Sequence, residues 1–218
     1  MSAARAPVAV RRLSPAQRGE IARHLARLSP EDRRLRFGRS MSGEALERHV
    51  ARIDFARDRV FGIHAPGLEL AGAAHLALDP DGQLAELGLS VDPALRGRGY
   101  GAALLARGVL HAANLGYRAL FMHCLAENRV MLHLAHKAGL KVVVHSGEAD
   151  ARIALERGAG GGLREALEDQ FALVDYLLRQ QGDWIARGAL QSRREAADEH
   201  RRAARAAEAH QGEVPDLA

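Results

Sequence analysis

The 218-residue sequence contains a single cysteine, Cys124, which excludes an internal disulfide and a cysteine-rich metal site. No apolar run is long enough to cross a membrane, and the first residues lack the apolar core and cleavage signal of a secretory leader. The eleven histidines show no H-E-x-x-H spacing, and His133 and His136, three apart, are a weak signal alone. We therefore expect a cytoplasmic protein without a membrane partner and without a metal.

Lysine is also scarce, since only Lys137 and Lys141 are lysines among 31 basic residues. The net charge of +4 suits anionic ligands in general. Aromatic residues make up only 4% of the chain, and no basic stretch carries the aromatic side chains that would strengthen a case for nucleic-acid binding. An apolar content of 47% and this length favour one α/β domain with an extension.

The chain is organised around residues 84–101, LAELGLSVDPALRGRGYG. Residues 84–91 alternate as a half-buried strand does, and Asp92-Pro93 predicts a turn. Residues 96–101, RGRGYG, then lead into an Ala/Leu-rich helix. Glycines between a strand end and a helix start let backbone N–H groups approach an anion, and the helix dipole adds to the attraction. The stretch predicts a phosphate-binding cradle.

Two known loop patterns fit this cradle. Gly97-x-Gly99-x-x-Ala102 fits a dinucleotide fingerprint, which requires a βαβ unit that the hairpin-like preceding segment does not supply. Arg96-x-x-Gly99-x-Gly101 resembles the [QR]-x-x-G-x-[GA] pyrophosphate loop of the GNAT N-acetyltransferases. Residues 8–157 resemble that superfamily in their order: strand, acidic residue, loop, helix, strand, and then Glu127-Asn128.

Turn and capping signals divide the rest of the chain. We expect strands at 8–13, 59–65, 68–78, 84–91, 118–125, 140–145 and 151–156, and helices at 15–28, 30–37, 43–53, 102–115 and 128–138. The fold class is α/β (α+β): a GNAT-like mixed, mostly antiparallel sheet flanked by helices. Its parallel pair joins the strand before the cradle to the strand that begins near Arg118.

The domain organisation follows from a change of composition. Residues 1–157 form the acetyltransferase-like domain, 158–162 (GAGGG) a linker, and 163–218 a helical C-terminal extension. Apolar residues recur there at helical spacing, at Leu163, Leu167, Phe171, Val174, Leu178 and Ile185. We expect this stripe to pack on the domain or on a second copy in a homodimer. Residues 191–210 predict a solvated helix or frayed tail.

The resemblance implies acetyl-CoA as co-substrate and a primary amine, of a protein lysine or a small molecule, as acceptor. The backbones of Leu89 and Val91 would bind the pantetheine arm. The loop would bind the pyrophosphate through Arg96, Gly97, Arg98, Gly99, Tyr100 and Gly101. Asn128 matches the asparagine that begins the second cofactor helix, and equally fits a helix N-cap.

Glu86 is the candidate general base. Amine acetylation requires a neutral amine, so a carboxylate or a water that it holds must take the proton of the ammonium. Glu86 shares a strand face with Gly88 and Ser90, and its position matches the catalytic glutamate of many GNAT enzymes. The alternative is a structural glutamate paired with a nearby arginine.

One position departs from the family pattern. Many GNAT enzymes carry a tyrosine seven residues after the asparagine, which protonates the departing thiolate, and this chain has Ala135 there. The protein-lysine acetyltransferases of bacteria also have a small or apolar residue at this position, and residues 28–37, LSPEDRRLRF, resemble the opening of their catalytic domain. Cys124 is an alternative acyl acceptor, but an apolar strand favours a buried thiol.

Three functions remain open: an acetyl-CoA-dependent N-acetyltransferase, which Glu86 favours; a non-catalytic acyl-CoA sensor, which the missing tyrosine favours; and a basic nucleic-acid or assembly protein.

Overall fold

The structure is a computed structural model that describes residues 8–67, 69–156, 162, 165–170, 172, 174 and 176. The chain divides into two compact units, residues 1–176 and 177–218, and all described residues belong to the first. Within the described residues, no helix is long and apolar enough to cross a membrane.

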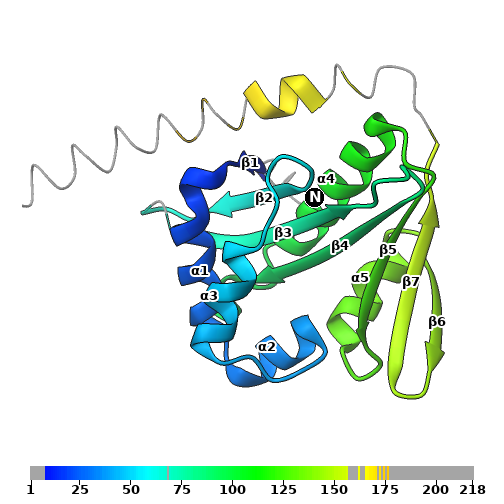
Figure 1. Ribbon diagram of the computed structural model, residues 1–218, viewed down its shortest axis with the longest axis horizontal. Helices are drawn as coiled ribbons and strands as arrows, with labels where there is room; N and C mark the ends of the chain where they lie inside the picture. Colours follow the sequence, from blue (N-terminus) through cyan, green and yellow to red (C-terminus); the bar gives the residue numbers. More distant parts are fainter. Residues whose placement is uncertain are drawn as a thin grey trace, which may run out of the picture. The chain divides into compact units, whose positions relative to one another are not determined.

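A seven-stranded sheet is the centre of the first unit (Figure 1). Its strands are β1 (Arg11–Leu13), β2 (Arg59–His64), β3 (Leu70–Leu78), β4 (Leu84–Val91), β5 (Ala119–Leu125), β6 (Lys141–His145) and β7 (Glu148–Ala154). They lie in the order β1-β2-β3-β4-β5-β7-β6, and of the pairings between these strands only that of β4 with β5 is parallel. The predicted mixed, mostly antiparallel sheet is therefore confirmed.

Strand β7 begins three residues earlier than predicted. The chain reverses at Ser146-Gly147, where both residues have left-handed backbone angles (φ 51° and 86°). This tight turn pairs His145 directly with Glu148. The sequence signal was weak because serine rarely adopts a positive φ.

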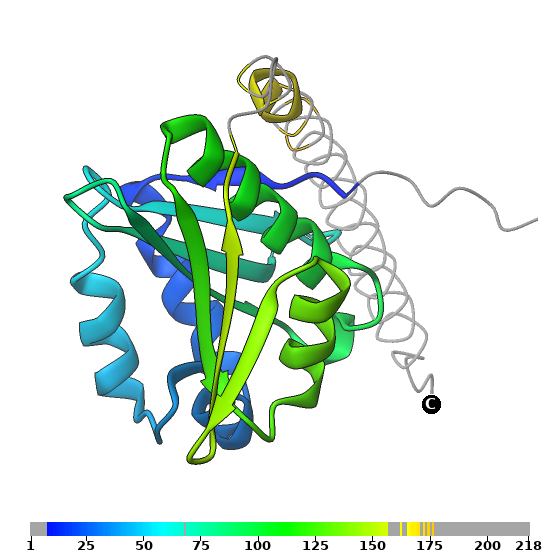
Figure 2. The ribbon, with the colours of Figure 1, turned by 90° about the vertical axis from the view of Figure 1, so that its right-hand side faces the viewer.

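Five helices cover the two faces of the sheet (Figures 1 and 2). They are α1 (Arg18–Arg27), α2 (Pro30–Phe37), α3 (Gly43–Ala51), α4 (Tyr100–Leu115) and α5 (Arg129–Lys137), with short 3-10 turns at Pro15–Gln17 and Pro93–Leu95. The side chains of Ser29 and Ser42 cap α2 and α3 by accepting hydrogen bonds from backbone N–H groups. Helices α1–α3 lie on one face of the sheet, and α4 and α5 lie on the other.

Each face has its own apolar core. On the α4 side, Phe61, Leu76 and Leu120 pack with Leu104 and other fully buried residues. Helix α4 approaches β4 closely because residue 108 is glycine: a Cβ there would lie 2.9 Å from a methyl carbon of Leu87.

The core on the other face contains a buried histidine. Apolar residues of α1 and α3 pack there on β2 and β3. His24 of α1 donates from Nδ1 to the Leu70 carbonyl (3.0 Å) and accepts at Nε2 from the Ser90 hydroxyl (2.9 Å). Burial lowers the pKa of His24 to about 4, so the ring is neutral at pH 7.

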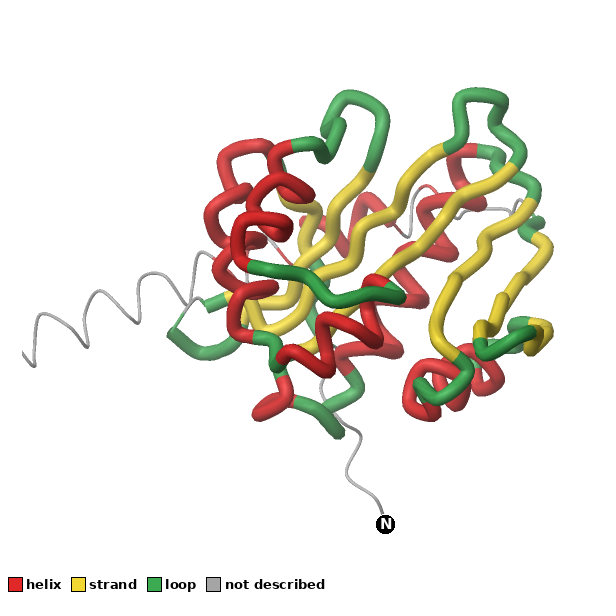
Figure 3. Tube along the Cα trace, turned by 60° about the horizontal axis from the view of Figure 1, so that its bottom comes forward, coloured by secondary structure: helices red, strands yellow, loops and turns green. Residues whose placement is uncertain are grey.

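Strands β4 and β5 separate after a short paired segment (Figures 1 and 3). Only Leu84–Glu86 of β4 pairs, with residues 119–121 of β5, although β4 continues to Val91 and β5 to Leu125. Helix α2 contacts both strands. The strands therefore open toward the loop at residues 96–101.

The described part of the C-terminal extension contacts α4 through acidic side chains. Glu168 pairs with the buried Arg107 at 3.0 Å, Asp169 pairs with the same guanidinium, and Glu165 hydrogen-bonds with His111. Burial raises the pKa of Glu165, but the hydrogen bonds from His111 and Asn114 outweigh it and lower the pKa overall. Arg107 and His111 of α4 thus bind three acidic side chains of this segment.

The structure describes two of the six residues of the predicted apolar stripe, Leu167 and Val174. Leu167 and Val174 are 47% and 53% exposed, whereas Ala172 is 1% exposed and Tyr176 contacts the ring of His64 and the guanidinium of Arg11. The other four stripe residues, and the predicted linker apart from Gly162, lie outside the described residues. A second copy of the chain as the partner of the stripe stays a prediction.

Candidate active site

The loop between β4 and α4 has the backbone that the cradle requires. Gly97 and Gly99 have φ of 72° and 81°, in the left-handed region that favours glycine. A Cβ on either residue would meet no atom within 4 Å, so the backbone angle and not space demands glycine. Gly99 is the N-cap of α4 and supplies no side-chain cap, so the first N–H groups of α4 are available to an anion.

Gly101 differs from the other two glycines. It lies in the first turn of α4 without a positive φ, and a Cβ there would lie 3.5 Å from Leu134 of α5, an ordinary contact. The fold therefore tolerates a side chain at this position. Tyr100 is half-buried and packs, like Leu134, against the apolar core on the α4 side of the sheet.

The two loop arginines have different surroundings. Arg96 donates to Asp32 of α2 at 2.6 Å, a pairing that the sequence did not indicate. Burial raises the pKa of Asp32, but the hydrogen bonds from Arg96 and Ser29 outweigh it and lower the pKa overall. Arg98 is exposed and makes no hydrogen bond or ion pair with a described residue. A phosphate at the loop would have to compete with Asp32 for Arg96.

The backbone of β4 offers hydrogen-bonding groups where the strands separate. Asp92 N–H donates to the Ala71 carbonyl, and Leu84 accepts from Asp79, so the even-numbered residues of β4 direct their backbone groups toward β3. Leu89 and Val91 therefore direct theirs toward the side of β5, beyond the last paired residue. The paired segment of β4 and β5 thus ends before the strand positions of Leu89 and Val91.

Glu86 lies at the end of the parallel pairing, opposite Phe121 of β5. Its side chain is exposed, and it shares a face with Gly88, as predicted. Helices α1–α3 pack on this face of the sheet. Helix α4, whose first turn follows the loop at residues 96–101, packs on the opposite face. A ligand passing between β4 and β5 from the loop would thus bring its far end to Glu86.

Asn128 is the N-cap of α5, the structural role that the sequence left open beside cofactor binding. Its Oδ1 accepts from Met131 N–H at 3.1 Å, and its Nδ2 donates to the Leu35 carbonyl of α2 at 3.4 Å. The adjacent Glu127 pairs with Arg34 of α2 at 2.5 Å. Helix α2 is thereby tied to the segment after β5, as Asp32 ties it to the loop after β4.

Two further positions are settled by burial. Ala135 is 1% exposed in the core, and its methyl group offers no hydroxyl there. Cys124 is buried on β5, on the face opposite to Phe121, and burial raises the pKa of its thiol. A neutral buried thiol is a poor nucleophile, which supports the structural role. Among the residues described, no three His, Cys, Asp or Glu side chains gather as a metal site would require.

Sequence reasoning missed a mostly apolar pocket with a few polar groups, which reaches Gly88, two residues from Glu86 on β4. It is lined by Arg36, Phe37, His49, His75, Gly88 and Ser90, with apolar residues of α1, β2 and β3. Asp58 accepts a hydrogen bond from Nε2 of His75 at 2.9 Å. Burial lowers the pKa of His75 despite this carboxylate, and burial lowers the pKa of His49 to about 4. Both rings are neutral at pH 7.

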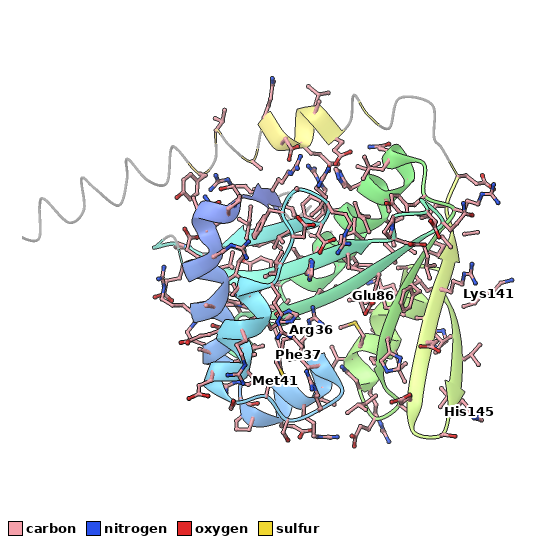
Figure 4. All side chains as sticks on the ribbon, in the orientation of Figure 1. Arg36, Phe37, Met41, Glu86, Lys141 and His145 are labelled. Carbon is pink, nitrogen blue, oxygen red and sulfur yellow. The ribbon has the colours of Figure 1, made fainter. Side chains whose placement is uncertain are left out.

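Figure 4 shows where Arg36, Phe37 and Glu86 lie in the molecule. The only sequence signal for the pocket was that Arg36 belongs to the motif at residues 28–37. The contact of the Arg36 side chain with β3 and β4 depends on how α2 and α3 pack on the sheet. No local sequence pattern encodes that packing.

Comparisons with known proteins agree with this geometry. The sequence model of the Acetyltransferase (GNAT) family matches residues 25–140, which include β4, the loop, α4, β5 and α5. Over 64 residues the chain is 39% identical to mycothiol acetyltransferase of Propionibacterium freudenreichii subsp. shermanii. That match spans 29% of this chain and only 20% of the relative.

Solved structures show the same fold. The GNAT domain of S. lividans PAT has a TM-score of 0.58 and 21% identity, over 67% of this chain and 89% of that one. Spermidine N-acetyltransferase from Vibrio cholerae, solved with CoA and spermine, has a TM-score of 0.54 and 18% identity, over 66% and 94% of the two chains. At these identities the likeness concerns architecture alone.

Proposed function

Because the chain belongs to the GNAT acetyltransferase family, we propose that it transfers the acetyl group of acetyl-CoA to a primary amine, with Glu86 as general base. The observation that carries this proposal is the position of Glu86 at the point where β4 and β5 separate. The loop at residues 96–101 opens on the same separation. A thioester held by the loop and by β4 would present its carbonyl beside the carboxylate.

The loop and β4 would hold acetyl-CoA. The N–H groups at the start of α4 would bind the pyrophosphate, and Arg98, with Arg96 once released from Asp32, would add charge-assisted hydrogen bonds. The backbones of Leu89 and Val91 would pair with the pantetheine amides. The neighbouring structures solved with CoA support this assignment by fold.

Glu86 takes the proton that the ammonium of the acceptor must lose. The nitrogen then attacks the thioester carbonyl carbon, so a C–N bond forms as the C–S bond breaks. The thiolate receives a proton from water or from the acceptor, because Ala135 offers none. The products are the acetylated amine and CoA, and the proton held by Glu86 passes to solvent across its exposed side.

The test is CoA release from acetyl-CoA with a panel of small amines, polyamines, amino acids and lysine-containing proteins. Release that depends on an amine, with the acetylated product identified by mass spectrometry, is the expected result. Tight acetyl-CoA binding without release for any acceptor would instead support the sensor function, which the missing tyrosine favours.

A further inference from the structure

The pocket beside Glu86 contains a cation without a hydrogen-bonding partner. The Nε of Arg36 is buried, and Arg36 makes no hydrogen bond or ion pair with any described residue. Its guanidinium lies 5.0 Å from the centre of the Phe37 ring. Buried charges in proteins are normally paired, because an unpaired one loses its hydration without compensation. A missing anion is the simplest complement to this group.

Glycine at position 88 makes room for Arg36. A Cβ on Gly88 would overlap the guanidinium of Arg36, so this side chain lies directly on the backbone of β4. Glu86 is on the same face of β4, two residues away, which corresponds to about 7 Å along the strand. The base and the cation are therefore neighbours on one surface.

The other polar residues near the pocket offer Arg36 no anionic partner. His49 and His75 are neutral, and the carboxylate of Asp58 is already occupied by His75 and Arg57. Glu86 is the one carboxylate whose charge reaches Arg36 among the described residues, and burial lowers the pKa of Arg36 to about 10 in spite of it. Arg36 remains a cation at pH 7.

We propose that Arg36 binds the carboxylate of the acceptor, so that the substrate is a zwitterionic α-amino acid. This rests on the proposed function and names its substrate class. The planar guanidinium can bind a carboxylate with two parallel hydrogen bonds, and the ammonium, joined to the carboxylate through one carbon, reaches Glu86. The carboxylate takes no part in the reaction and only orients the amine.

The same geometry disfavours two other acceptor classes. A polyamine would bring a second ammonium group toward Arg36, and like charges repel at this range. The side-chain amine of a protein lysine has no carboxylate near it, so Arg36 would stay unpaired. Both should be poorer acceptors than an amino acid.

The experiment compares matched acceptors. The twenty L-amino acids are assayed for CoA release, and the best one is compared with its α-carboxamide and its decarboxylated amine. We expect kcat/KM for the acid to exceed that for the other two by about 10- to 100-fold, the scale of a charge-assisted pair. Arg36→Met should abolish this preference through KM for the acceptor, with KM for acetyl-CoA unchanged.

Two more variants control for folding and charge. Gly88→Ala keeps Arg36 but displaces its guanidinium, and it should lose the same preference. Arg39→Met removes an exposed arginine three residues away and should keep the preference. If Arg36→Met lowers kcat equally for all three acceptors, Arg36 acts only on Glu86 and the inference is wrong.

The outcomes separate the inference from the proposed function. Amine-dependent CoA release that is equal or faster for carboxamides, polyamines or lysine proteins would overturn the inference alone. If no acceptor releases CoA, the proposed function fails, and calorimetry then measures the binding of the twenty amino acids to the protein–CoA complex. Binding that Arg36→Met abolishes would support the carboxylate site, and absence of binding would overturn it.

Discussion

Asp32→Asn should increase the affinity for acetyl-CoA. Arg96 now pairs with Asp32 at 2.6 Å, and their side chains are 46% and 16% exposed. An ion pair this exposed contributes about 0.2–1 kcal/mol. That free energy opposes the movement of Arg96 toward the pyrophosphate, so removing the charge of Asp32 should tighten binding by about 1.4- to 5-fold. Asparagine keeps the shape and leaves the Ser29 cap of α2 in place.

Calorimetry at low salt provides the assay, and the gain should shrink in high salt. Arg96→Met should weaken binding by about 10- to 100-fold, and Asp32→Asn should have no effect in that background. Glu31→Gln is the matched control, because Glu31 pairs with Arg34 instead. Weaker binding by Asp32→Asn, or the same gain without Arg96, would refute the competition between Asp32 and phosphate.

Four further predictions test the site and the fold. Glu86→Gln should lower kcat by about 10²-fold with little change in acetyl-CoA affinity, and the loss should shrink at high pH; wild-type rates at pH 7 would make Glu86 structural. Gly101→Val should weaken CoA binding while circular dichroism stays unchanged, and unaltered affinity by calorimetry would remove the loop from the site. Truncation after Gly162 should destabilise the domain or convert a dimer to a monomer, whereas light scattering and melting curves identical to the full chain would exclude both. His24 has a folded-state pKa of about 4 against 6.5 in the unfolded chain, so the unfolded state binds its proton first as pH falls. Urea unfolding should show about 2 kcal/mol less stability at pH 5 than at pH 7 from this group, and His24→Gln should lack that difference.

The sequence alone predicted most of the elements and the cradle, because the signals for both are local. Alternation over residues 84–91 placed Glu86 and Gly88 on one face, and the structure confirms it. Serine caps and proline at first helical positions predicted the start of α2. Gly97 and Gly99 have left-handed backbone angles. This requirement for glycine is local, because it depends on the φ of each residue and not on its neighbours in space.

The tertiary structure alone decided which charges meet. Three sets of ion pairs, Asp32 with Arg96, Arg34 with Glu127, and Arg107 with Glu168 and Asp169, join positions that are 61 to 93 residues apart. Local periodicity reports which face of an element is apolar, and it carries no information on which other element that face meets. For this reason the pocket of Arg36 was missed, since it depends on how separate helices pack on one sheet.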